Sequence, residues 1–253
     1  MTARETLRQS GAAIRKQLGF PDNSPDTELA PGLNRLAEEF VWGSIWARPG
    51  LALDDRMLAV LSALTSRQRL PQLRRYIGAA LHIGVSPRTI QEVFIHCGLY
   101  SGFPTILNAL TLANEVFAEQ GIVVPDTEMP DRDADALMAL GQETMRRLHG
   151  DRAEGGYAAP DNTTTAAMYP TAVAYGYGEI WNRPDLDYHQ RMICAVAAFT
   201  AIDALPQLIK FTQSALGTGL SRAQIVEIIM QTGPYSGFPR ALNALSAFSN
   251  VPG

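Results

Sequence analysis

Four side chains in the first half of the chain have types and positions suited to proton transfer on a small molecule. His96 precedes Tyr100 by four residues, so both lie on one face of a predicted helix and can reach the same pocket. Histidine is the side chain best suited to proton transfer near neutral pH. We therefore interpret His96 as the candidate base or acid. Tyr76 and Tyr100 are the candidate hydrogen-bond donors to a substrate oxygen, and Arg48 is the candidate anion-stabilising group.

Each of these residues also has a purely structural interpretation. Arg48, immediately before Pro49, could clamp a carboxylate or enolate, or it could anchor its loop by binding helix-end carbonyls. Arg56 has the same two interpretations. Large aromatic side chains mostly serve packing, and a single histidine is often a hydrogen-bonded side chain at a packed contact. The further candidates for substrate binding are Trp46, Arg56, Gln72, His82 and His189.

The cysteines and histidines do not predict a metal or redox centre. Cys97 and Cys194 are the only cysteines, and they lack the Cys-x-x-Cys spacing of a redox or metal site. None of the four histidines is paired with another at the i, i+4 spacing of a metal-binding helix. We therefore expect no metal.

The composition is typical of a soluble globular protein. The chain has 253 residues, of which 46% are hydrophobic and 18% charged, and a net charge of -4. No basic tract suits nucleic acid or an anionic membrane, and no apolar run approaches the roughly 20 residues that a membrane helix needs. The first eleven residues lack the apolar stretch of a secretory signal. These features predict a cytoplasmic protein that binds a small molecule, not nucleic acid or membrane.

The sequence contains an internal repeat. Residues 42–51, Trp-Gly-Ser-Ile-Trp-Ala-Arg-Pro-Gly-Leu, recur at 177–186 as Tyr-Gly-Glu-Ile-Trp-Asn-Arg-Pro-Asp-Leu, an offset of 135 that then holds without a gap for about 70 residues. Residues 100–104, Tyr-Ser-Gly-Phe-Pro, recur at 235–239. Upstream the offset is 130, so the second copy has about five extra residues, which fit the glycine-rich stretch 150–161.

Both copies have the pattern of helices joined by short loops. Asp54 can cap a helix whose apolar residues fall on one face, and Ser86-Pro87 opens another. No segment alternates with a period of two. The sequence therefore predicts an all-α protein of two tandem helical bundles. The first module is expected at residues 1–120, a Pro- and Asp-rich linker at 121–132, and the second module at 133–253.

The Trp-Gly-x-Ile-Trp-x-Arg-Pro-Gly-Leu motif, the Arg-led apolar helix 56–64 and the later Tyr-x-Gly-x-Pro resemble the carboxymuconolactone decarboxylase family over nearly the whole of both copies. The resemblance implies two helical modules that assemble around a threefold axis, pockets near the contacts between subunits, and no cofactor or metal. It makes a homotrimer the favoured homo-oligomer, with a dimer as the alternative.

Three positions depart from the patterns of related branches. The alkylhydroperoxidase D-like branch uses a Cys-x-x-Cys-x-x-x-His run where this chain has Arg69, Gln72 and Tyr76, so a Cys-dependent peroxidase is excluded. The decarboxylase branch commonly has an acid and a histidine at the positions of Gln72 and Tyr76. Neither residue replaces a carboxylate–imidazole pair at neutral pH.

The favoured hypothesis is a cofactor-independent enzyme that acts on a small carboxylate, lactone or enolisable substrate of aromatic or secondary metabolism. Decarboxylation, lactone opening, isomerisation and cyclisation all pass through an enolate, and the residues do not choose among them. The alternative is a non-catalytic binding or assembly protein that keeps the bundle. Because Tyr76, His82 and His96 become Phe211, Gly217 and Gln231 in the second copy, we expect the chemistry to be asymmetric and to belong mainly to a pocket lined by the first copy.

Overall fold

The computed structural model describes residues 2–22, 28–159 and 161–252, and it contains no β-strand in these ranges. The all-α prediction is thus confirmed. The helices of the first copy are α1 (Ala3–Gln17), α2 (Leu33–Ala37), the π-helix η2 (Glu38–Trp46), α3 (Leu53–Ser66), α4 (Leu70–His82), α5 (Pro87–Ser101) and α6 (Phe103–Glu119). Those of the second are α7 (Ala134–His149), the short helices η3 (Gly150–Glu154), η4 (Gly156–Ala158) and α8 (Tyr169–Thr171), the π-helix η5 (Ala172–Glu179), η6 (Ile180–Asn182), α9 (Tyr188–Ile202), α10 (Leu205–Gly217), α11 (Arg222–Ser236) and α12 (Phe238–Ser249).

The helix boundaries follow from local sequence. The Ser86 hydroxyl accepts the backbone N–H of Thr89 at the start of α5, and Ser221 forms a capping box with Gln224 at the start of α11. Helix α3 differs from the prediction, because its N-cap is Ala52 and not Asp54. Asp54 lies instead in the first turn, where its carboxylate still interacts favourably with the helix dipole.

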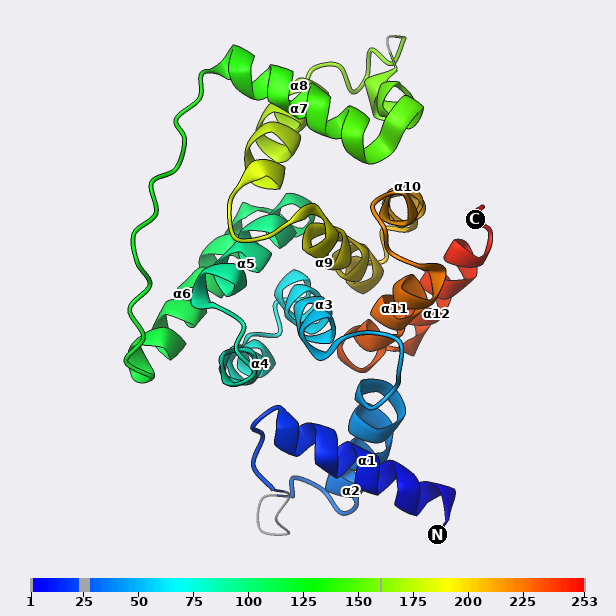
Figure 1. Cartoon of the computed structure of the whole chain (residues 1–253). Helices are drawn as coiled ribbons and strands as arrows, with labels where there is room; N and C mark the ends of the chain where they lie inside the picture. Colours follow the sequence, from blue (N-terminus) through cyan, green and yellow to red (C-terminus); the bar gives the residue numbers. More distant parts are fainter. Residues whose placement is uncertain (1, 23–27, 160, 253) are drawn as a thin grey trace.

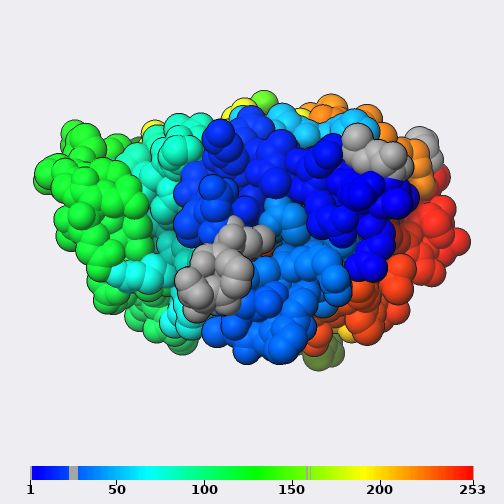
Figure 2. All heavy atoms as spheres, turned by 90° about the horizontal axis from the view of Figure 1, so that it is seen from below, coloured from blue at the N-terminus to red at the C-terminus, as the bar shows by residue number. Residues whose placement is uncertain are grey.

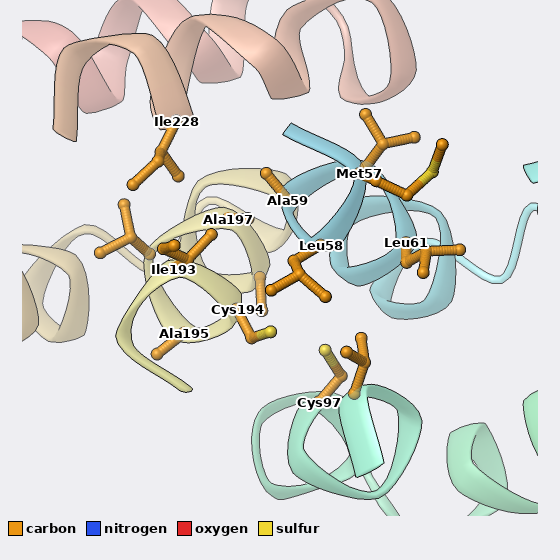
Figure 3. Packing of buried hydrophobic residues seen from close by; sticks show 14 of the residues in the cluster. Met57, Leu58, Ala59, Leu61, Cys97, Ile193, Cys194, Ala195, Ala197 and Ile228 are labelled. Atoms are coloured by element: carbon orange, nitrogen blue, oxygen red, sulfur yellow. The ribbon is translucent and has the colours of Figure 1, made fainter. Parts of the chain in front are cut away.

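Helices α3 and α9 are the centre of the molecule, one from each copy, and the other helices surround them (Figure 1). Both are buried on nearly all sides, which explains their almost continuous apolar sequences. In Figure 3 the side chains of Leu58 and Ile193 lie in a core to which α5 and α11 also contribute. Cys97 and Cys194 are in this core as buried free thiols, and burial raises the pKa of the Cys194 thiol to about 11.

Glycines allow two close helix contacts that are equivalent in the two copies. A Cβ at Gly43 would lie 2.3 Å from the carbonyl oxygen of Leu7, so α1 packs directly on the backbone of η2. A Cβ at Gly178 would lie 2.2 Å from the carbonyl oxygen of Leu137, and α7 packs on η5 in the same way.

The two copies share one hydrophobic core. The segment between α6 and α7 runs along the outside of the molecule and brings α7 to the end opposite α1 (Figure 1). Figure 2 shows that residues 28–50 adjoin the orange and red helices α11 and α12 of the second copy. The largest buried cluster contains side chains from α3, α4 and α5 together with α9, α10 and α11. The limits 1–120 and 133–253 describe the sequence repeat and stay a prediction for separate modules, because one hydrophobic core includes side chains from both ranges.

No helix in the described ranges is both long enough and apolar enough to cross a membrane.

Candidate active site

The first Arg-Pro loop is bound by helix α11 of the other copy. Arg48 forms a bidentate ion pair with Glu227 at 2.8–3.1 Å, and the buried guanidinium of Arg56 donates to the same carboxylate at 2.9 Å. Arg56 also donates to the Arg48 carbonyl at 2.7 Å and to the Gln231 side-chain oxygen at 2.9 Å. We call Trp46, Arg48, Arg56, Glu227, Gln231 and Tyr235 the Arg48 cluster.

The second Arg-Pro loop repeats this arrangement against α5. Arg183 forms a bidentate ion pair with Glu92 at 2.8–3.0 Å, and Arg191 donates to the Arg183 carbonyl at 2.7 Å. The Arg191 guanidinium lies 3.6 Å from the Glu92 carboxylate. We call Trp181, Arg183, Arg191, Glu92, His96 and Tyr100 the Arg183 cluster.

Each cluster therefore combines the loop of one copy with the helix of the other. Arg48 does bind a carboxylate, but it is the carboxylate of Glu227. The carbonyl-binding role that the sequence allowed for these arginines belongs to Arg56 and Arg191. Sequence reasoning missed Glu92 and Glu227, although the offset of 135 relates them and each is an acid on an otherwise apolar helix stripe.

The clusters differ where His96 takes the place of Gln231. Gln231 accepts a hydrogen bond from Arg56, but His96 forms none with Arg191 side-chain nitrogens, and Nε and Nη1 of Arg191 are buried without a partner. The His96 ring nitrogen Nε2 lies 3.1 Å from the Arg191 carbonyl oxygen and 3.1 Å from the Tyr100 hydroxyl. Burial, followed by the charge of Arg191, holds the pKa of His96 well below its ordinary value. His96 is therefore neutral at pH 7.

Aromatic rings fill the space beside the Arg48 cluster. The Tyr235 hydroxyl lies 2.6 Å from both the Trp46 indole nitrogen and the Tyr76 hydroxyl. Phe20 packs on Tyr76 and on Trp42 with ring centroids 5.2 and 5.1 Å apart. Tyr76 is thus bound to the second copy through Tyr235, and it contacts neither His96 nor Tyr100 in the described hydrogen bonds and ring pairs.

A cavity of about 550 Å³ lies beside the Arg183 cluster. Phe211 stands here at the position equivalent to Tyr76, so a ring without a hydroxyl faces Tyr100 at 6.0 Å between centroids. We call this space the α5–α10 cavity. It is lined by Leu99 and Tyr100 of the first copy and by Tyr157, Met168, Tyr169, Ala172, Gly176, Tyr177, Trp181, Phe199, Ile202, Ala204, Gln207, Lys210 and Phe211 of the second.

A buried hydrogen-bonded chain supports one wall of this cavity. The Tyr177 hydroxyl lies 2.9 Å from Nε2 of His149, and Nδ1 of His149 lies 2.7 Å from the Ser214 hydroxyl. Arg152 donates to that hydroxyl at 3.0 Å. Burial, with the charges of Lys210 and Arg152, lowers the pKa of His149 to about 3. This imidazole is neutral, and its hydrogen bond fixes the position of the Tyr177 hydroxyl.

Lys210 supplies positive charge to the cavity. Its side chain is half-buried and forms no ion pair among the described residues, although its backbone carbonyl accepts from Arg152. Burial, followed by repulsion from Arg152, lowers the pKa of Lys210. An unpaired ammonium group at a largely apolar surface favours an anionic ligand. Sequence reasoning missed both Lys210 and His149, because neither belongs to a repeated motif.

The remaining predicted residues are spread over the molecule. Gln72 is exposed, whereas its counterpart Gln207 lines the α5–α10 cavity and donates to Tyr157. His82 is exposed beside Gly19, at a separate surface cavity of about 800 Å³. His189 lies near Asp55, at the start of α9. The structure thus groups most of the predicted residues at two places: His96 and Tyr100 in the Arg183 cluster, and Arg48, Trp46, Arg56 and Tyr76 in or beside the Arg48 cluster. The cavity beside His82 is lined by residues of the first copy and of the linker, but neither His96 nor Tyr100 lines it. The α5–α10 cavity, which Tyr100 does line, is formed mainly by the second copy, so the expectation that a pocket of the first copy would hold these residues together is wrong.

The helical fold and the two Arg-Pro loops define a tandem protein of the carboxymuconolactone decarboxylase type. The model of the carboxymuconolactone decarboxylase family matches residues 31–115 and again 166–250, and the chain belongs to this family.

Similar proteins include two named decarboxylases. The chain is 37% identical over 83 residues to 4-carboxymuconolactone decarboxylase of Acinetobacter baylyi, which covers 33% of this chain and 62% of that protein. It is 29% identical over 85 residues to nitrosuccinic acid decarboxylase of Metarhizium robertsii, which covers 34% of this chain and 59% of that protein. The aligned region thus spans about three fifths of the length of these two relatives.

A crystal structure of a proposed gamma-carboxymuconolactone decarboxylase subunit from Burkholderia xenovorans is similar over the whole length. It has a TM-score of 0.58 and 18% identity, with 98% of this chain and 97% of that chain covered. At this level of identity the likeness establishes the shared fold alone.

Proposed function

We propose that this protein is a decarboxylase-type enzyme that acts on a small carboxylate in the α5–α10 cavity without a cofactor. The observation that carries the proposal is the unpaired Lys210 side chain in the lining of a cavity that Tyr100 and Tyr177 also line. The names of the two relatives, which describe decarboxylation of carboxymuconolactone and nitrosuccinic acid, support the reaction class.

The cavity supplies the groups that such a reaction needs. When the C–C bond to the carboxylate breaks, its electron pair must move to a neighbouring acceptor group such as a lactone carbonyl or a nitro group. We assign Lys210 and Tyr100 to the oxygen of that acceptor group, where they stabilise the developing negative charge. The apolar wall of Trp181, Phe199 and Phe211 then receives the departing carboxylate as neutral CO2, and excluding water there favours loss of the charge.

The remaining step is protonation of carbon. The electron pair returns from the enolate or nitronate oxygen to carbon, which takes a proton. We assign this proton to solvent that reaches the cavity, because the Tyr177 proton is already donated to Nε2 of His149. The Ser214 hydroxyl donates to the Lys210 carbonyl oxygen, so it accepts from Nδ1–H of the neutral His149, and Nε2 is left as an acceptor. Burial raises the pKa of Tyr177 above its ordinary value, so the phenol stays protonated at neutral pH and keeps its hydrogen bond to His149.

The test is release of CO2 from 4-carboxymuconolactone and from nitrosuccinate by the purified protein, without added metal or cofactor. Turnover of at least one of them is expected, and Tyr100→Phe should lower kcat by roughly 100-fold, the usual effect of removing one oxyanion donor.

The matched control is Tyr235→Phe, the equivalent change in the Arg48 cluster. It removes a hydroxyl bound to Trp46 and Tyr76, so it should lower thermal stability but leave turnover of the folded protein within a few-fold of the parent, because Tyr235 does not line the cavity. Equal loss of turnover in both variants, or binding of both acids without CO2 release, would contradict the proposal. The latter result would favour a non-catalytic binding protein.

A further inference from the structure

The hydrogen-bond geometry around His96 specifies the direction in which Tyr100 donates. The carbonyl oxygen of Arg191 can only accept, so its 3.1 Å contact with Nε2 of His96 requires a proton on that nitrogen. Because the imidazole is neutral, Nδ1 then carries no proton. The Tyr100 oxygen lies 3.1 Å from the same Nε2, so it accepts from the Nε2–H group and does not donate to it.

The Tyr100 proton is consequently free to point elsewhere. No other hydrogen bond of the Tyr100 hydroxyl occurs within the described ranges, and the residue lines the α5–α10 cavity. We propose that His96 is a positioning residue: as the Nε2–H tautomer it fixes the Tyr100 oxygen and leaves the Tyr100 proton directed into the cavity as a donor to substrate. This inference rests on the proposed function and adds a role for His96 different from that of a base.

The Arg48 cluster shows why the same arrangement does not occur twice. There the Tyr235 oxygen accepts from the Trp46 indole at 2.6 Å and shares a hydrogen bond with the Tyr76 hydroxyl at 2.6 Å, so its proton has a protein partner available. At the Arg183 cluster Phe211 replaces Tyr76 and offers no hydroxyl. His96 is the one described side chain that holds the Tyr100 oxygen.

The burial of His96 favours positioning over proton transfer. The side chain has no exposed surface and is absent from the cavity lining, so a substrate in the cavity would contact Tyr100 and not the imidazole. The charged groups around it are Arg191 on α9 and Glu92 on its own helix, and Glu92 is already paired with Arg183.

The first test reads the tautomer directly and needs no substrate. The chain has four histidines, so protein labelled with 15N-histidine gives few ring signals, and His96→Gln identifies those of His96. The two ring nitrogens have distinct chemical shifts in each neutral tautomer and in the imidazolium. A neutral His96 protonated on Nε2 at pH 7 is expected. A proton on Nδ1, or an imidazolium, would overturn the inference.

The second test separates a hydrogen-bond donor from a base. The amide nitrogen of a glutamine can replace Nε2–H, whereas leucine cannot. His96→Leu should lower kcat on the order of tenfold or more, through loss of Tyr100 orientation, and His96→Gln should recover most of that loss. If folded His96→Gln is as impaired as His96→Leu, the imidazole itself takes part in the reaction and the inference is wrong. If neither test acid is turned over, the proposed function fails, and the tautomer alone decides whether His96 holds Tyr100 as described.

Discussion

At the scale of single residues, two histidines are buried as neutral imidazoles beside cavity-lining tyrosines. His96 contacts Tyr100 and His149 contacts Tyr177, and neither imidazole is itself part of the cavity lining. The type and spacing of His96 and Tyr100 were enough to predict that the two side chains lie together, and the structure has them in contact. His149 could not be found in the same way, because Gly19 occupies the equivalent position of the first copy and its partner Tyr177 replaces Trp42.

These histidines make stability depend on pH. Both have a lower pKa in the folded protein than the value of about 6.5 expected in the unfolded chain, so below pH 6.5 the unfolded chain binds more protons. The stability that these two histidines contribute is fully present above pH 6.5. It is lost as the pH falls toward the pKa of each histidine in the folded protein, which for His149 is about 3.

Each histidine should remove about 1.4 kcal/mol of unfolding free energy per pH unit in that window. Denaturant unfolding at pH 7, 6 and 5 measures how steeply the unfolding free energy falls with pH. His96→Gln should reduce this slope by the contribution of one histidine, about 1.4 kcal/mol per pH unit. An unchanged slope in that variant would show that His96 is not buried as a neutral group.

At the scale of elements, the Arg-Pro loops connect the two copies. The sequence predicted the helices and the importance of the loops, because capping residues and apolar stripes are local signals. It did not predict that each loop binds a glutamate of the other copy, since nothing local in Arg48 or Glu227 indicates a contact across 179 positions. An arginine that clamps a substrate and one that clamps a buried glutamate have the same sequence signature.

Removing either glutamate should destabilise the protein strongly. Glu227→Gln leaves Arg48 and the buried Arg56 without a countercharge, and Glu92→Gln does the same to Arg183 and Arg191. Breaking a buried ion pair from one side typically costs about 3–5 kcal/mol. Thermal or denaturant unfolding measures the loss. A change below about 1 kcal/mol, the size typical of an exposed pair, would show that these contacts do not stabilise the fold.

At the scale of the whole molecule, the shared core of α3 and α9 makes the tandem repeat one structural unit. The two copies should therefore unfold together in a single calorimetric transition whose calorimetric and van't Hoff enthalpies agree. Glu92→Gln should shift that one transition to lower temperature without dividing it. Two separate transitions in the parent protein would mean that each copy is stable on its own.

The expected homotrimer remains a prediction. Exposed apolar side chains occur at equivalent positions of α6 and α12, namely Phe103 and Leu107 in the first copy and Phe238 and Leu242 in the second. If these side chains are buried between subunits, contacts between chains decide whether two or three subunits assemble. The sequence of one chain does not determine that number of subunits.

Conversion of a small carboxylate in the α5–α10 cavity, as proposed above, is tested most directly by comparing two cationic side chains related by the offset of 135. Lys210 lines this cavity, and Arg75, its counterpart, lies at the other surface cavity, over the ring of Phe20. Lys210→Met and Arg75→Met each remove one positive charge. The measured quantity is kcat/KM for CO2 release from the acid that is turned over. Lys210→Met should lower it roughly 10- to 150-fold, which is the effect expected from losing one hydrogen bond to a charged group. Arg75→Met should remain within a few-fold of the parent. A large loss in Arg75→Met with little change in Lys210→Met would place the reaction in the other cavity and contradict the account.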